Sequence, residues 1–169
     1  MKKYELTKET KTLLGGTVLH RIRALLDIPR HGVKAGELGG FVEGENNLSQ
    51  DDNAWVRGDA CVSGNAKVYD KAWVYDKAWV CGDAEVSGNA KVSGNADYMV
   101  IKNIWSSGRW FTYTRSNKKW KVGCFYGTGE ELVAKAYKDS KLSGKCYEAI
   151  VRAVETIEAA KAEAKGEAK

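Results

Sequence analysis

The sequence predicts a mainly β protein whose centre is a short left-handed parallel β-helix, a form of β-solenoid. Two observations carry this prediction. Alanine recurs every six residues from Ala54 to Ala96, and a valine stands two residues after each alanine as far as Val92. A polar turn pair, Gly-Asn, Gly-Asp or Asp-Lys, separates successive units. The flanks add an N-terminal β-hairpin cap, a C-terminal β-hairpin and two α-helices.

The chemistry of the six-residue unit explains the prediction. Ala-x-Val is a short strand with both side chains on one face, and glycine, asparagine and aspartate tolerate the left-handed backbone of a corner. Three units would form a triangular coil of eighteen residues, and several coils must stack to bury their apolar faces. A helix is excluded because a period of six does not keep one face of a helix with about 3.6 residues per turn. A flatter, two-sided solenoid is the alternative.

Three segments follow from this pattern: an N-terminal cap over residues 1–40, the repeats over 41–98 and a C-terminal part over 99–169. Alternating side chains on either side of Gly15-Gly16 predict two strands and a hairpin. We expect this hairpin to cover the open end of the repeats, because an uncovered strand edge invites aggregation.

The C-terminal part predicts a second hairpin, which turns at residues 116–118, and two helices. Thr128 and Glu131 have the spacing of a capping box, which places the start of the first helix there. The second helix is expected to run from about Gly144 with one apolar stripe.

Composition narrows the class of protein. No apolar stretch approaches the roughly 20 residues of a membrane span, and the polar N-terminus predicts no signal peptide. A cytoplasmic protein without membrane contact is therefore expected. The four cysteines form no CxxC pair and have no histidine clustered with them, so we expect free thiols, no metal site and no cofactor.

Charge is segregated along the chain. The net charge is +5, but residues 45–99 sum to −4, whereas residues 1–44 sum to +3 and residues 100–169 to +6. Such asymmetry indicates an anionic partner. The alternative is that the basic ends only attract the acidic middle or keep the protein soluble.

The repeats resemble those of the hexapeptide-repeat left-handed β-helix family. In that family an aliphatic residue is followed four residues later by a small one, as Val56 is by Ala60. Many such proteins are acyltransferases that act as trimers and use a histidine, so the resemblance implies this activity as an option. The only histidines, His20 and His31, lie outside the repeats, and we do not expect an enzyme.

A second resemblance covers most of the chain. The stretch 36–43, Gly-Glu-Leu-Gly-Gly-Phe-Val-Glu, precedes the Asn-Ala-x-Val repeats, and Lys3-Tyr4-Glu5-Leu6 and Gly123-Cys124-Phe125 frame them. This arrangement looks like a family of small phage and prophage proteins. The resemblance implies a viral or prophage origin and action in the cytoplasm of a bacterial host.

Aromatic residues at the outward positions of the repeats are the first candidate site. They are Trp55, Trp73, Tyr75, Trp79 and Tyr69. Exposed aromatic residues mark protein interfaces, so these residues predict contact with a host protein or with further copies in a homo-oligomer. The alternative is a scattered set of side chains, or one that the C-terminal helices cover.

A basic and aromatic hairpin is the second candidate site. Its candidate nucleic-acid contacts are Arg109, Tyr113, Arg115, Lys118, Lys119 and Lys121. Cations interleaved with aromatic rings suit phosphate neutralisation and base stacking. The alternative is an exposed hairpin whose tryptophans, Trp110 and Trp120, pack against the helices.

No catalytic constellation is apparent in the sequence. His20 alternates with apolar residues of a predicted strand and is expected in the core, and His31 follows Pro29 in a predicted solvated loop. The aromatic surface without a catalytic constellation predicts a non-enzymatic binding protein, and the resemblance to small phage and prophage proteins implies that it binds a host macromolecule. Antagonism of a host defence system is the hypothesis for that binding. The alternatives are a nucleic-acid-binding accessory protein and a self-assembling structural protein.

Overall fold

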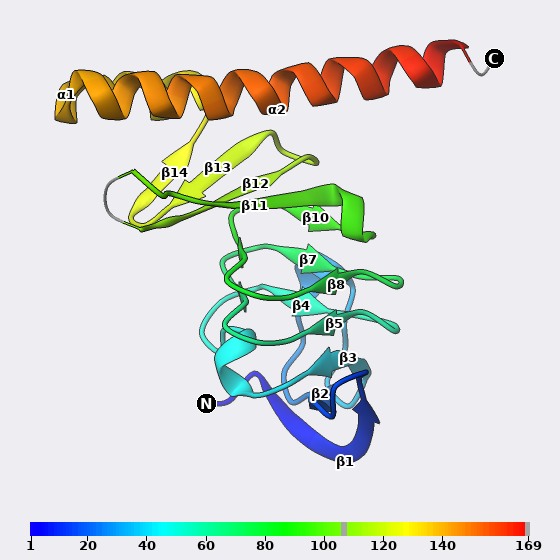
Figure 1. The fold of residues 1–169 in the computed structure, drawn as a ribbon. Helices are drawn as coiled ribbons and strands as arrows, with labels where there is room; N and C mark the ends of the chain where they lie inside the picture. The colour runs from blue at the N-terminus through cyan, green and yellow to red at the C-terminus, as the bar shows by residue number, and fades with distance from the viewer. Residues whose placement is uncertain (106–107, 168–169) are drawn as a thin grey trace. The chain divides into compact units, whose positions relative to one another are not determined.

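The structure, a computed structural model, describes residues 1–105 and 108–167. The chain forms two compact units, Met1–Cys124 and Phe125–Lys169 (Figure 1). The division into three segments drawn from the sequence stays a prediction.

The first unit begins with an antiparallel hairpin. Strand β1 (Tyr4–Thr12) pairs with β2 (Val18–Ala24), and β2 pairs on its other side with β3 (Leu38–Val42). Gly15 and Gly16, at the turn between β1 and β2, both have positive φ, which suits glycine because it lacks a Cβ. A loop with a short 3₁₀ helix, η1 (Pro29–His31), connects β2 to β3.

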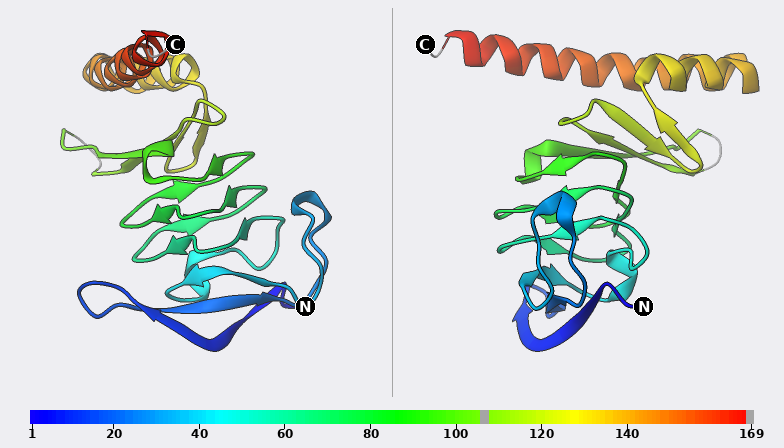
Figure 2. Two further views of the ribbon diagram at one scale, coloured as in Figure 1. Left: turned by 90° about the vertical axis from the view of Figure 1, so that its right-hand side faces the viewer. Right: turned by 180° about the vertical axis from the view of Figure 1, so that it is seen from behind.

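Seven strands of two residues each form the repeat region. They are β4 (Trp55–Val56), β5 (Cys61–Val62), β6 (Lys67–Val68), β7 (Trp73–Val74), β8 (Trp79–Val80), β9 (Glu85–Val86) and β10 (Lys91–Val92). They pair in parallel with strands eighteen residues away, as Trp55 does with Trp73 and Cys61 with Trp79. Figure 2 shows these short strands in successive layers.

The repeated alanines and valines form the core of this region. Ala54 to Ala90 and Val56 to Val92 are buried at every step of the repeat. The left-handed corners are glycines except at Asp70 and Asp76, whose φ values are 62° and 57°. The pattern ends at Ala96, which is exposed because the chain there enters the 3₁₀ helix η3 (Asn95–Asp97).

The predicted fold class is wrong and has to be corrected. The structure is a mixed arrangement of several small sheets, some parallel and some antiparallel, with two helices, rather than a mainly β left-handed parallel β-helix. Because each unit contributes only two paired residues, the parallel strands form small sheets of order β10-β7-β4 and β6-β9. The remaining parallel strands join the antiparallel hairpin in a sheet of order β1-β2-β3-β5-β8.

Side chains close the strand edges at one end of the repeat region. Asn95 Oδ1 accepts from the Trp79 N–H at 2.9 Å, and Tyr98 Oη donates to the Trp79 carbonyl at 2.9 Å. Thr112 Oγ1 accepts from the Glu85 N–H at 2.9 Å, and Ser116 Oγ accepts from the Lys91 N–H at 2.7 Å. These bonds satisfy backbone groups that an open edge would leave unpaired.

At the opposite end of the repeat region, a side chain also forms hydrogen bonds with backbone groups. A 3₁₀ helix, η2 (Glu45–Asn47), carries the buried side chain of Asn47. Asn47 Nδ2 donates to the carbonyls of Gly64 and Ala66, both at 2.9 Å, and its Oδ1 accepts from the Gly44 N–H at 2.9 Å. One amide side chain therefore pairs three backbone groups.

The rest of the first unit is an antiparallel arrangement. Strand β11 (Tyr98–Lys102) pairs with β12 (Trp110–Thr114), which pairs with β13 (Lys119–Val122). The β12–β13 turn includes Lys118 at a φ of 52°.

The second unit comprises β14 (Phe125–Gly127), α1 (Gly129–Asp139) and α2 (Lys141–Glu167). The capping box predicted at Thr128 is confirmed, since Thr128 Oγ1 accepts from the Glu131 N–H. Helix α2 begins at Lys141, earlier than the predicted start near Gly144. A Cβ at Gly144 would lie 2.2 Å from the Tyr137 ring, so the close approach of α1 and α2 explains a glycine inside a helix.

Candidate binding site

Three of the five candidate aromatic residues belong to a packed cluster rather than to an open surface. Trp55 is fully buried and meets the Tyr4 ring edge-on at 6.4 Å. Trp73 stacks on Tyr75 at 4.4 Å between ring centroids, and the His31 ring lies 5.3 Å from Trp73 on the η1 loop. The prediction that Trp55 faces a partner is therefore wrong, and Trp73 and Tyr75 are only partly exposed.

Tyr69 is also half-buried and already engaged. Its hydroxyl bonds to Glu85 Oε2 at 3.1 Å, and the Lys121 ammonium lies 5.8 Å from its ring centroid. Burial raises the pKa of Tyr69 well above its usual value. The neutral hydroxyl is therefore available as a donor to Glu85 at any physiological pH.

His31 is buried rather than solvated, which corrects the expectation for this loop. It is 9% exposed, and its Nε2 has no hydrogen-bond partner among the described residues. Burial lowers the pKa of His31 from its usual value, and the positive charges of Arg30, Lys3 and Lys91 act in the same direction. A hydrogen bond with the backbone of Asn53 partly opposes these effects.

The buried His31 predicts a specific pH dependence of stability. Folding lowers the pKa of His31, so just below pH 6.5 the unfolded chain binds more protons at this residue than the folded chain does. The stability that neutral His31 contributes is therefore fully present above about pH 6.5 and is lost as the pH falls from there toward the pKa of the folded state. In wild type, the free energy of unfolding measured by urea titration should decline between pH 7.5 and pH 5. We expect His31→Phe to make this decline less steep, by at most about 1.4 kcal/mol per pH unit. Asn46→Ala, which changes an exposed residue without a titratable group, is the control and should keep the wild-type slope. Equal slopes for wild type and His31→Phe would contradict this assignment.

Trp79 alone among the five presents a large open ring, and it is 40% exposed. Its indole Nε1 donates to Ser63 Oγ at 3.0 Å, and its main-chain N–H and C=O are bound by Asn95 and Tyr98. Burial raises the pKa of Tyr98 to about 12, so its hydroxyl stays protonated and able to donate. The ring is thus held in place before any partner arrives.

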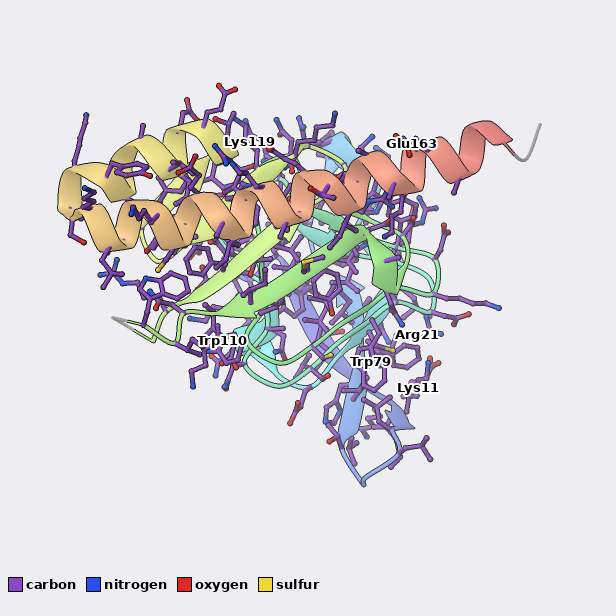
Figure 3. All side chains as sticks on the ribbon, turned by 45° about the horizontal axis from the view of Figure 1, so that its top comes forward. Lys11, Arg21, Trp79, Trp110, Lys119 and Glu163 are labelled. Atoms are coloured by element: carbon purple, nitrogen blue, oxygen red, sulfur yellow. The ribbon has the colours of Figure 1, made fainter. Side chains whose placement is uncertain are left out.

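A groove runs beside this ring. It is a cavity of about 460 Å³, and we call it the Trp79 groove. Its lining residues are Lys11, Leu13, Asp59, Cys61, Lys77, Ala78, Trp79 and Asn95. Figure 3 shows Lys11 and Trp79 on the same side of the first unit, with Arg21 close by.

Strand pairing in the sheet places the side chains at the base of the groove next to one another. Phe41 pairs with Cys61, and Cys61 pairs with Trp79, so the three side chains lie in one row. The Lys11 ammonium reaches over from β1, 5.5 Å from the Phe41 ring centroid and 3.5 Å from Cys61 Sγ. The Arg21 guanidinium lies 4.4 Å from the same ring. Cations over aromatic faces are attracted by the ring quadrupole, which fixes both side chains beside the groove.

The structure separates the candidate nucleic-acid residues. Tyr113 is buried and packs against Trp120 at 5.0 Å between ring centroids, so it cannot stack on a base. Lys121 lies 3.8 Å from a Glu85 carboxylate oxygen. Arg109 and Lys118 are exposed, whereas Arg115 and Lys119 are half-buried.

Aromatic packing explains why the hairpin does not form a stacking platform. Phe111, Tyr113, Trp120 and Val122 are all buried, and Trp120 meets Phe111 edge-on at 6.4 Å. Trp110 is 37% exposed, and the Lys102 ammonium lies 5.4 Å from its ring centroid. The mixture of cations and aromatic residues in the hairpin sequence therefore arises because most of the aromatic rings form a buried face, while basic side chains such as Arg109 and Lys118 are exposed.

Sequence reasoning missed Lys11, Lys77 and Phe41. Lys11 lies in the hairpin and Phe41 precedes the regular repeats, so neither follows the six-residue period. Lys77 is part of a turn pair.

Among the residues that the structure describes, no three His, Cys, Asp or Glu side chains gather closely enough to hold a metal ion. Within the same residues no helix has the length and apolarity needed to cross a membrane. No model of a known protein family matches the chain, and no curated protein is significantly similar to it.

Proposed function

We propose that the protein is a non-enzymatic binding protein of phage or prophage origin that engages a host macromolecule in the bacterial cytoplasm through the Trp79 groove. The observation that supports this proposal most is a partly exposed tryptophan, fixed by its own hydrogen bonds, at the edge of a cavity of about 460 Å³. The sequence resemblance to small phage proteins supports the origin, and antagonism of a host defence component is the corresponding role.

Trp79 has the properties of an interface hot spot. Tryptophan is enriched at such positions, and energetically important residues cluster where a well-packed pocket excludes water. A ring that is ordered before binding loses little side-chain entropy when a partner covers it. The groove residues offer ring contact, ammonium donors and one carboxylate, a set suited to noncovalent recognition.

The experiment compares two exposed tryptophans of the first unit. Tagged wild type, Trp79→Ala and Trp110→Ala would be used to capture host proteins, and the captured partner would be purified for titration. We expect Trp79→Ala to weaken binding by at least about 30-fold, as for a hot-spot loss of roughly 2 kcal/mol. Trp110→Ala should bind as wild type does.

Light scattering of the purified protein comes before the titration, because the homo-oligomer expected from the sequence stays a prediction. Equal retention of the purified partner by wild type and Trp79→Ala would exclude the Trp79 groove as the binding surface. The absence of any retained host protein would contradict the proposed function as a whole.

A further inference from the structure

Two ammonium groups of the Trp79 groove have no acidic partner among the described residues. Among the described residues, Lys11 and Lys77 take part in none of the ion pairs. The neighbouring cation Arg21, in contrast, is paired with Glu9 at 2.8 Å. Elsewhere in the first unit, Lys3 is paired with Asp52 at 3.4 Å. Lys11 Nζ instead donates to Cys61 Sγ, a weak acceptor. Both lysines retain unused donors at the wall of a cavity that contains an exposed aromatic ring.

The backbone beside the groove is not available for strand addition. Strand β8 is the last strand of its sheet, but its N–H and C=O at Trp79 are taken by Asn95 and Tyr98. The N–H of Cys81 also donates to Tyr98 Oη at 3.3 Å. A ligand must therefore bind through side chains and not by extending the sheet.

We propose that the occupant of the Trp79 groove is a short acidic segment of a partner protein, with carboxylates at Lys11 and Lys77 and an apolar or aromatic side chain against Trp79. This inference rests on the proposed function and names the chemistry of its partner. Lysine ammonium groups bind carboxylates by charge-assisted hydrogen bonds, and the tryptophan ring supplies apolar contact area.

The charge around the groove favours a short acidic segment over a nucleic acid. Asp59 lines the groove, and residues 45–99 carry a net charge of −4. A nucleic acid extends a continuous row of phosphates across a surface and requires many cations along it. A peptide places only a few carboxylates, and these can meet the two lysines while avoiding Asp59.

The test is a titration of the full chain with a fluorescein-labelled peptide that carries carboxylates around a central phenylalanine. Lys11→Met and Lys77→Met keep the aliphatic stem and remove the charge. Lys71→Met is the matched control, because Lys71 occupies the same place as Lys77 in the preceding unit and does not line the groove. We expect each groove variant to weaken peptide binding roughly fivefold and Lys71→Met to leave it unchanged. Circular dichroism and urea unfolding establish that each variant is folded.

Two further probes decide between ligand classes. A peptide with amides in place of every carboxylate should bind much more weakly, and added salt should weaken the acidic peptide. Equal binding of the amide peptide, or tighter binding of a single-stranded oligonucleotide of the same charge, would overturn the inference.

The captured partner separates this inference from the proposed function. If Trp79→Ala abolishes partner binding while Lys11→Met and Lys77→Met do not affect it, the groove remains the binding surface, but its occupant is not an acidic segment. If none of the three substitutions weakens partner binding, both proposals fail.

Discussion

Replacing Trp55 by alanine should remove a large part of the stability of the first unit. Trp55 is fully buried in the main hydrophobic core, beside Tyr4 and next to Trp73 in the parallel register. Tryptophan-to-alanine changes at such sites cost about 3–5 kcal/mol, because they combine lost burial with a cavity. Since domains are stable by only about 5–15 kcal/mol, the urea midpoint should fall sharply.

Two companion variants make the test specific. Trp55→Phe keeps most of the ring volume and removes an indole N–H that has no partner among the described residues, so its cost should stay below about 1.5 kcal/mol. Trp79→Ala removes a ring that is 40% exposed and should cost much less than Trp55→Ala. A smaller loss for Trp55→Ala than for Trp79→Ala would show that the buried and exposed tryptophans have been assigned the wrong way round.

Replacing Asn47 by alanine should be the second most damaging change. It leaves the carbonyls of Gly64 and Ala66 and the N–H of Gly44 without their partner at the end of the repeat region. A buried polar group without a partner costs about 1–3 kcal/mol, so we expect a total loss of roughly 2–4 kcal/mol in the free energy of unfolding, allowing for water at the more accessible groups.

An aspartate at position 47 distinguishes hydrogen bonding from size. Asn47→Asp preserves the shape but places a carboxylate against two carbonyl oxygens, so it should be at least as destabilising as alanine at pH 7. Burial and this repulsion would raise the pKa of the new carboxyl on folding, and its stability should recover as the pH falls, because the neutral acid can donate again. Asn46→Ala, at an exposed neighbour, is the control. An aspartate variant as stable as wild type at pH 7 would refute the role assigned to Asn47.

The repeat pattern predicted which side chains face inward. An alanine and a valine two residues apart on a strand must share a face, and the buried positions from Ala54 to Val92 follow this rule. The parallel pairs also have the spacing of eighteen residues expected for stacked units. The pattern could not predict how the small sheets combine, because the joining of β3 to the antiparallel hairpin depends on residues outside the repeats.

The candidate site was harder to predict for a related reason. Outward positions of the repeats are equivalent in the sequence, but the η1 loop with His31 lies against Trp73 and leaves Trp79 open. Which of two outward tryptophans stays exposed depends on a contact between distant segments. Likewise, the strand spacing of Arg109, Tyr113 and Arg115 predicts that they share one face, yet the Tyr113 ring is buried against Trp120.

Site-specific photocrosslinking inside the host would show directly whether a host macromolecule binds at the Trp79 groove. A benzophenone amino acid would replace Leu13, which lines the Trp79 groove, or Leu38, which lies outside it and is 50% exposed. We expect a covalent adduct between the chain and one host macromolecule from the Leu13 position and none from Leu38, with the adduct lost when Trp79→Ala is added. Adducts of equal yield from both positions, or an adduct from Leu13 that survives Trp79→Ala, would contradict this expectation.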